Sequence, residues 1–209
     1  MNPNNESATS SGNQPAEPSQ RRLQRSPDFT GLQLSKFSDV VLRHGLPGLL
    51  LALICLMHPT SLELLVVSTT TAFENWVFYL ACALLTLFAM CGYALMLDRK
   101  LDLMKLGWIL YLLGISIWEE WVFRLAIPQI LVEQELSLRA SVVISNLLFG
   151  AMHYFTLRWK WQWCVLAFLG GMGLSRNFHT LEDFMLIVAI HWIATFINTP
   201  RYPGQLRRG

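Results

Sequence analysis

The segment from Phe78 to Leu97 contains no charged residue. About 20 consecutive apolar residues suffice to cross the hydrocarbon core of a bilayer as a helix, which satisfies its own backbone hydrogen bonds there. Only 14% of the residues in the chain are charged, whereas 53% are hydrophobic. A soluble domain carries roughly a quarter charged residues. The chain is therefore predicted to be an all-α protein, a polytopic transmembrane helical bundle.

Further apolar stretches predict about six spans in all. The first is the least regular, because Pro59 and Glu63 interrupt an apolar run that begins at Leu46 and continues to Val67. The other five spans are predicted at Trp76–Leu97, Leu103–Val132, Leu138–Phe155, Trp161–Leu174 and Phe184–Asn198.

Composition divides the chain into four segments. Residues 1–28 are rich in Asn, Ser, Gln and Pro, and such a segment is expected to be a disordered tail because it buries too little apolar surface. Residues 29–102 are expected to hold an interfacial helix, from Phe29 to His44, and the first two spans. Residues 103–199 hold the remaining spans, and residues 200–209 form a second tail.

Lysine and arginine predict the orientation in the membrane. They gather in both tails and in the loops Arg99–Lys105 and Arg158–Lys160, whereas the alternate loop from His58 to Asn75 has none. Loops that carry Lys and Arg stay on the cytoplasmic side. We therefore expect a multi-pass protein of the cell (inner) membrane with both termini in the cytoplasm.

Charge and cysteine content narrow the possible partners. The net charge of +2 is small and no basic run is interleaved with aromatic residues, so the lipid bilayer is an expected partner and nucleic acid is not. The four cysteines all lie in apolar stretches without a Cys-x-x-Cys pair. They are expected to be small buried hydrophobic residues without disulfides.

Three ionisable residues lie inside the third predicted span: Glu119, Glu120 and Arg124. Such residues are costly within a membrane and indicate a functional site. Glu120 and Arg124 are four residues apart on one helix face and can pair. Glu119 points about 100° away and has no partner on its own helix, as a general base requires. The cluster can alternatively serve only to hold helices together, but two adjacent glutamates with an arginine favour catalysis.

Two histidines lie in later spans. Either His153 or His191 alone is more often an interhelical hydrogen-bonding group, but with the glutamates they form a set that can hold a water molecule and move its proton. If all helices are straight, His153 lies about 9 Å nearer the cytoplasm than Glu119. Helix tilt or a kink at Pro128 can close that gap.

These residues form three ordered strings, each inside a predicted span. The strings are Glu-Glu-x-x-x-Arg at Glu119, Glu120 and Arg124, Phe-x-x-x-His at Phe149 and His153, and a last histidine at His191 followed four residues later by Thr195. Together they resemble the CAAX-protease and bacteriocin-processing (CPBP) family, a glutamic-type intramembrane endopeptidase family. The resemblance extends from Leu103 to Asn198, so residues 103–199 are interpreted as a CPBP-like protease core. Where the family usually has asparagine, this chain has Thr195.

The resemblance implies hydrolysis of a peptide bond in a membrane-associated protein or peptide substrate, without a metal or other cofactor. It implies that Glu119 and His153 activate a water molecule, that His191 and Thr195 hold the oxyanion, and that Glu120 and Arg124 orient the site. The threonine side chain offers one hydrogen-bond donor and is shorter than that of asparagine. The oxyanion contact implied for Thr195 is therefore the part of the family pattern that this sequence changes.

Three other functions are compatible with parts of the pattern. Glutamate and histidine are also zinc ligands, which allows a zinc-dependent membrane protease, although no His-Glu-x-x-His string is present. A non-catalytic membrane adaptor or immunity-type protein with the same fold is favoured by Thr195. A proton-coupled transporter is disfavoured because the sequence shows no internal repeat.

Overall fold

The computed structural model describes residues 36–205, and these residues form helices without any β-strand. The all-α prediction is confirmed. The expected tail at residues 1–28, residues 29–35 of the expected interfacial helix and the last residues, 206–209, lie outside the described part. The helices are α1 (Phe37–Val40), α2 (Leu46–Leu56), α3 (Pro59–Glu74), α4 (Trp76–Asp98), α5 (Leu103–Glu120), α6 (Ile127–Glu133), α7 (Leu138–Thr156), α8 (Trp161–Leu181) and α9 (Phe184–Asn198), with π-helical turns at Val41–Gly45 and Trp121–Ala126.

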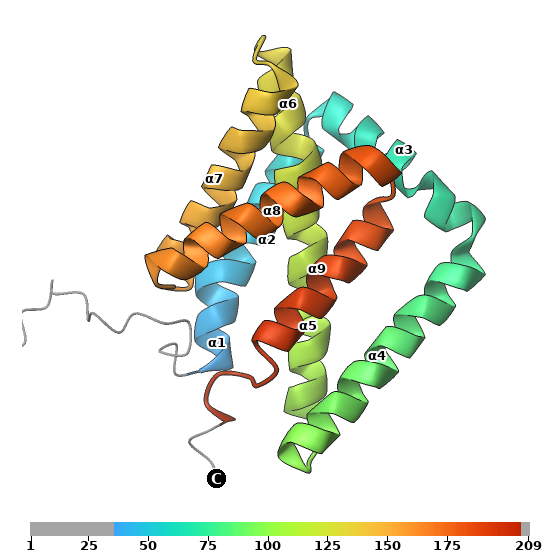
Figure 1. Cartoon of the computed structure of the whole chain (residues 1–209), viewed down its shortest axis with the longest axis vertical. Helices are drawn as coiled ribbons and strands as arrows, with labels where there is room; N and C mark the ends of the chain where they lie inside the picture. Colours follow the sequence, from blue (N-terminus) through green and yellow to red (C-terminus); the bar gives the residue numbers. More distant parts are fainter. Residues whose placement is uncertain (1–35, 206–209) are drawn as a thin grey trace, which may run out of the picture.

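Helix α5 lies in the middle of the bundle (Figure 1). It packs against α2, α4 and α9, and its continuation through the second π-helical turn into α6 packs against α7. Helix α8 lies across α7. Figure 1 also shows that α7, α8 and α9 are inclined to α5 rather than parallel to it, so residues at different heights in their own helices can meet.

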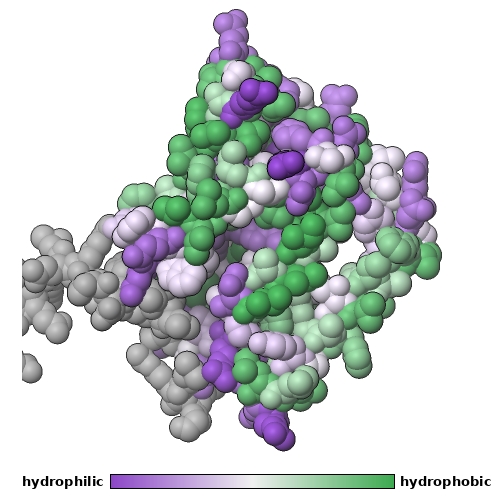
Figure 2. Space-filling model, viewed as in Figure 1, coloured by the Kyte–Doolittle hydropathy of each residue, from purple (hydrophilic) through white to green (hydrophobic). Residues whose placement is uncertain are grey.

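Three helical stretches of the described chain are long and apolar enough to cross a membrane. They are Phe37–Leu56 with 20 residues, Trp76–Asp98 with 23 and Leu103–Glu133 with 31, whereas Phe184–Asn198 is apolar but shorter. A membrane-type helical bundle is therefore confirmed, and the count of six spans stays a prediction. Leu85 and Phe88 on α4 are 69% and 77% exposed, and Figure 2 shows hydrophobic residues along that helix. Lipid is the medium that such a surface suits.

The first membrane helix differs from its prediction. The sequence predicted an interfacial helix to His44 and a separate span from Leu46, but the structure has one uninterrupted helix, Phe37–Leu56. Pro47 lacks the N–H that a continuous α-helix uses, and the π-helical turn Val41–Gly45 comes just before it. The apolar run after Met57 forms the separate helix α3, which begins at Pro59, where the missing N–H costs nothing.

Lys105 is buried, although the sequence placed it in a basic loop. Its Nζ donates to Asp98 Oδ2 at 2.6 Å, to the carbonyl oxygen of Pro200 at 2.9 Å and to Gln205 Oε1 at 2.8 Å. Arg201 pairs with the same aspartate at 2.8 Å. These bonds fasten the α4–α5 turn and the C-terminal segment to the same end of the bundle. That agrees with their predicted placement on one side of the membrane, while the orientation of that side stays a prediction.

Two glycines allow the first membrane helix, Phe37–Leu56, to approach α5 closely. A Cβ at Gly45 would lie 2.9 Å from Tyr111 Oη, and a Cβ at Gly48 would overlap the indole ring of Trp118. Trp118 directly precedes Glu119. The face of α5 that carries Tyr111 and Trp118 therefore packs on the bare backbone of the first membrane helix.

We expect Gly48→Ala to lower the stability of the protein in detergent by about 1–3 kcal/mol, because the added methyl group overpacks the Trp118 ring. The measurement is the midpoint of thermal unfolding. Gly92→Ala on α4 is the matched control, since a Cβ there meets no atom within 4 Å. Equal midpoints for the two variants would show that the close approach does not constrain the fold.

Candidate active site

The end of α5 and the π-helical turn after it carry three buried ionisable side chains. Glu119, Glu120 and Arg124 are 1%, 0% and 2% exposed. Arg124 Nε lies 3.1 Å from Glu120 Oε2, so the pair expected from the four-residue spacing is present. The guanidinium group also lies over the ring of Phe149, with 4.3 Å from Cζ to the ring centroid, which adds a cation–π contact in a desolvated place.

Glu120 has a partner on each side. Its Oε1 lies 2.5 Å from His191 Nδ1 on α9, while Oε2 faces Arg124. Both oxygens of this carboxylate are therefore engaged, one by a cation and one by an imidazole nitrogen. This arrangement orients His191 through Oε1, while Oε2 faces the Arg124 guanidinium group in an ion pair.

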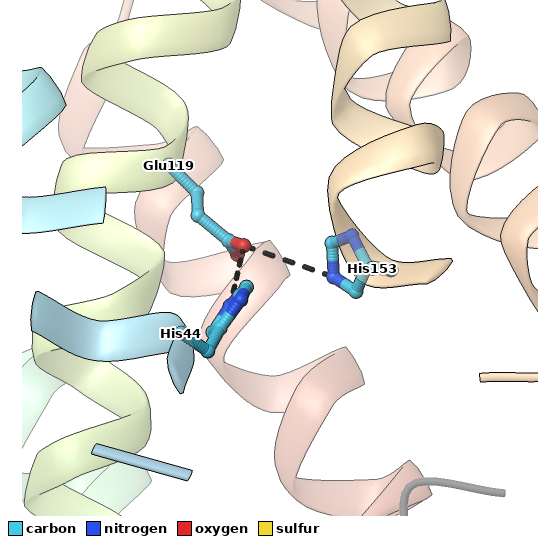
Figure 3. A group of neighbouring side chains, drawn as sticks. All are labelled: His44, Glu119 and His153. Atoms are coloured by element: carbon cyan, nitrogen blue, oxygen red, sulfur yellow. Dashed lines mark hydrogen bonds and ion pairs between the residues drawn. The ribbon is translucent and has the colours of Figure 1, made fainter. Parts of the chain in front are cut away.

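Glu119 is surrounded by histidines from three other parts of the chain. Its Oε1 lies 3.1 Å from His44 Nε2 and 3.7 Å from His153 Nε2, and its Oε2 lies 3.5 Å from His191 Nε2. Figure 3 shows His44 and His153 directed at this carboxylate from two different helices. The sequence prediction that Glu119 has no partner on its own helix agrees with these contacts.

The ring of His153 is oriented by its own helix. Its Nδ1 lies 2.8 Å from the carbonyl oxygen of Phe149. A carbonyl oxygen only accepts, so Nδ1 carries the hydrogen, and the Nε2 of the neutral ring has a free lone pair facing Glu119. The axial gap expected between His153 and Glu119 is closed because α7 is inclined to α5 (Figure 1).

His44 is a member of this cluster that the sequence reading missed. It is 2% exposed and lies in the first π-helical turn, where the sequence predicted the end of an interfacial helix. Besides Glu119, its ring contacts Trp118 and His153, with centroid separations of 5.5 Å and 5.4 Å. The available signal was a histidine followed by a long uncharged run, which places it within a span rather than at an interface.

Thr195 is not joined to the cluster. It is half-buried on α9, one helical turn beyond His191, and no hydrogen bond of its hydroxyl group is found within residues 36–205. Of the six residues that the sequence singled out, Glu119, Glu120, Arg124, His153 and His191 are connected by the contacts above. Thr195 shares only the helix of His191.

Gly171 on α8 makes room for the arginine. A Cβ at Gly171 would collide with Asn146 Oδ1 and would lie 3.1 Å from Arg124 Nη2. Asn146 is fully buried, and its amide group donates to the carbonyl oxygen of Val142 and to Ser175 Oγ at 2.8 Å and 3.0 Å. Helices α7 and α8 thus form the wall on which the Arg124 side chain lies.

Residues 102–197 match the family model described as Type II CAAX prenyl endopeptidase Rce1-like. This part of the chain is similar to that family. No curated protein and no solved structure matches the chain. The matched part contains the two glutamates, Arg124, His153, His191 and Thr195, whereas His44 precedes it.

The match to the Rce1-like model supports a membrane protease of the CAAX type, a hydrolase. The resemblance seen in the sequence is thereby confirmed at the level of the family. The connected residues named above are the candidate active site, because they are the buried ionisable groups that the matched segment brings together.

We expect Glu120→Ala and Arg124→Ala each to reduce the amount of folded protein. Removing one partner leaves the other charge buried without compensation, which typically costs about 3–5 kcal/mol. Replacing both with apolar residues, as in Glu120→Leu with Arg124→Met, removes both charges and should recover part of the loss. Recovery should be incomplete because His191 also loses its partner.

The measurement is the monodisperse fraction after purification in detergent, together with the thermal midpoint. Arg176→Ala on α8 is the control, because Arg176 is exposed. A double variant that is no better folded than either single variant would show that the two residues do not act as a pair.

Proposed function

We propose that the chain is an intramembrane endopeptidase in which Glu119 and His153 activate a water molecule that attacks the scissile carbonyl group. The observation that carries this proposal is the separation of 3.7 Å between Glu119 Oε1 and His153 Nε2. That separation is too long for a direct hydrogen bond. Two acceptor atoms facing each other at that range suit a water molecule that donates one hydrogen to each.

The reaction then proceeds in two steps. As the water oxygen bonds to the carbonyl carbon, its proton passes to Glu119 and the carbonyl electron pair moves onto the carbonyl oxygen. The C–N bond then breaks, the carbonyl group re-forms, and Glu119 returns the proton to the departing nitrogen. The products are a carboxylic acid and an amine, and no acyl-enzyme is formed.

His191 is the proposed donor to the oxyanion. Glu120 accepts from Nδ1, so donation from Nε2 to the oxyanion needs a hydrogen on that nitrogen as well. His191 Nε2 lies 3.5 Å from Glu119 Oε2, next to the place where the water is activated. Thr195, one turn further along α9, is the proposed second donor.

The proposed substrate is a membrane-associated protein or peptide. The family description refers to prenylated CAAX substrates, and an apolar helical surface suits a substrate that is held at the bilayer. A farnesylated CAAX peptide with a fluorophore and a quencher on either side of the scissile bond is therefore the first probe.

We expect Glu119→Gln to lower the cleavage rate of that peptide by roughly 10²–10⁴-fold, because the amide cannot take the proton of water. The amount of folded protein should stay near that of the wild type, since the size of the side chain is kept. The measurement is the rate in proteoliposomes. Glu133→Gln is the matched control, the same change in the same helical stretch at a site that is about a third exposed. Full activity of Glu119→Gln would overturn the glutamate mechanism, and an inactive wild type would favour the adaptor function.

A zinc-dependent protease is a second candidate that one observation favours. His44, Glu119 and His153 are all buried, and each offers a ligand atom within 4.8 Å of the others. Two histidines and a glutamate with a fourth position left for water form a known catalytic zinc arrangement.

Chelation separates the two mechanisms. We expect the wild-type rate to be unchanged after dialysis against a zinc chelator and to gain nothing from added zinc, because a water activated by Glu119 and His153 needs no metal. Metal content by mass spectrometry of the purified protein is the parallel measurement. A rate that falls with the chelator and returns with zinc would assign the site to the metalloprotease.

A further inference from the structure

His44 holds a place that the family match does not explain. It belongs to the helix Phe37–Leu56, which precedes the matched residues 102–197. Even so, its Nε2 makes the shortest of the three histidine contacts to Glu119, 3.1 Å against 3.5 Å and 3.7 Å. Only this one lies within ordinary hydrogen-bond length.

The packing around His44 supports a specific role rather than a chance contact. Gly45 and Gly48 bring its helix against Tyr111 and Trp118 of α5, which places the ring beside the glutamate that follows Trp118. The ring lies in a π-helical turn, and single π-helical turns inside α-helices are frequent at functional sites. The second such turn of the described chain contains Arg124.

The contacts of Nδ1 show which nitrogen of the His44 ring carries a hydrogen. His44 Nδ1 lies 2.8 Å from Thr156 Oγ1, and the hydroxyl hydrogen of Thr156 is donated to the carbonyl oxygen of Met152 at 2.8 Å. The hydroxyl oxygen therefore accepts from His44 Nδ1–H. A hydrogen bond from Nε2 to the Glu119 carboxylate then needs a hydrogen on this nitrogen as well, so His44 donates from both ring nitrogens.

We propose that His44 is a positioning residue for Glu119, which it holds through a relay that runs from Met152 through Thr156 to the carboxylate. The proposal rests on the function proposed above, in which Glu119 is the base. One bond to Oε1 fixes the rotation of the carboxylate, so that Oε1 faces His153 and Oε2 faces His191. Without it, the carboxylate can turn away from the water, and a misplacement of about 1 Å can cost about 10²-fold in rate.

Four variants test the proposal with the farnesylated peptide in proteoliposomes. His44→Leu removes both hydrogen bonds and is expected to lower kcat by about 10²-fold with KM unchanged, because substrate binding is not affected. His44→Gln keeps a donor of similar reach to Glu119 and should recover part of kcat. Thr156→Val keeps the ring and removes only its support, so its kcat should lie between the two. His58→Gln is the matched control, since His58 pairs with Glu133 instead.

A second measurement does not depend on turnover. The protein is labelled with ¹³C-glutamate, and the infrared band of the Glu119 carboxyl group is identified as the one that is missing from Glu119→Gln. We expect this band to shift in His44→Leu and to stay in place in His58→Gln. Thermal midpoints measured on the same samples separate positioning from folding.

The outcomes distinguish the two proposals. An inactive Glu119→Gln beside a fully active His44→Leu with an unshifted band would overturn the role of His44 and leave the base in place. The role of His44 would also be overturned by three results together: His44→Leu loses folded protein, His44→Gln does not recover it, and the band in Thr156→Val is unshifted. His44 would then be a packing residue only. An active Glu119→Gln would overturn the proposed function, and the infrared band would still decide whether His44 binds Glu119.

Discussion

Burying two adjacent carboxylates in a bundle that suits a bilayer is the constraint on which the rest of the structure depends. An isolated ion in a low-dielectric medium is costly enough that it must be paired or neutralised. Glu119 and Glu120 are 1% and 0% exposed, and the arginine beside them supplies one positive charge. Two carboxylates and one guanidinium leave one negative charge, and three histidines around the carboxylates supply further polar contacts.

This demand explains why the helices around α5 are inclined and closely packed. No single neighbouring helix can surround both carboxylates, so α7, α9 and the first membrane helix each contribute one histidine. Glycines sit where backbones must come near these side chains: Gly48 beneath Trp118, and Gly171 beside the Arg124 guanidinium. The small residues are therefore placed by the size of the groups at the site, in addition to the general preference for small residues at helix contacts in membranes.

Local patterns in the sequence predicted what lies on one helix, and failed where distant segments meet. The α4 span follows from an uncharged run, and the Glu120–Arg124 pair follows from four-residue spacing, because both depend on one helix alone. His44 was assigned to an interface and Lys105 to a loop, because nearby charges and a proline imitate a helix end. In the structure His44 contacts Glu119, which is 75 positions away along the chain. Lys105 contacts Asp98 and Pro200, which are 7 and 95 positions away. Periodicity does not predict which helices become neighbours.

The two glutamates show how adjacent identical residues acquire different chemistry from their surroundings. Glu120 has one oxygen at 2.5 Å from His191 and the other at 3.1 Å from Arg124, so it is held and cannot exchange partners freely. Glu119 has one close contact, to His44, and two imidazole nitrogens at 3.5 Å and 3.7 Å. Those longer separations suit a small molecule between the groups better than direct bonds. A turn of about 100° along α5 thus separates a residue that fixes the site from one that can react, and His44 keeps the second residue turned toward its water.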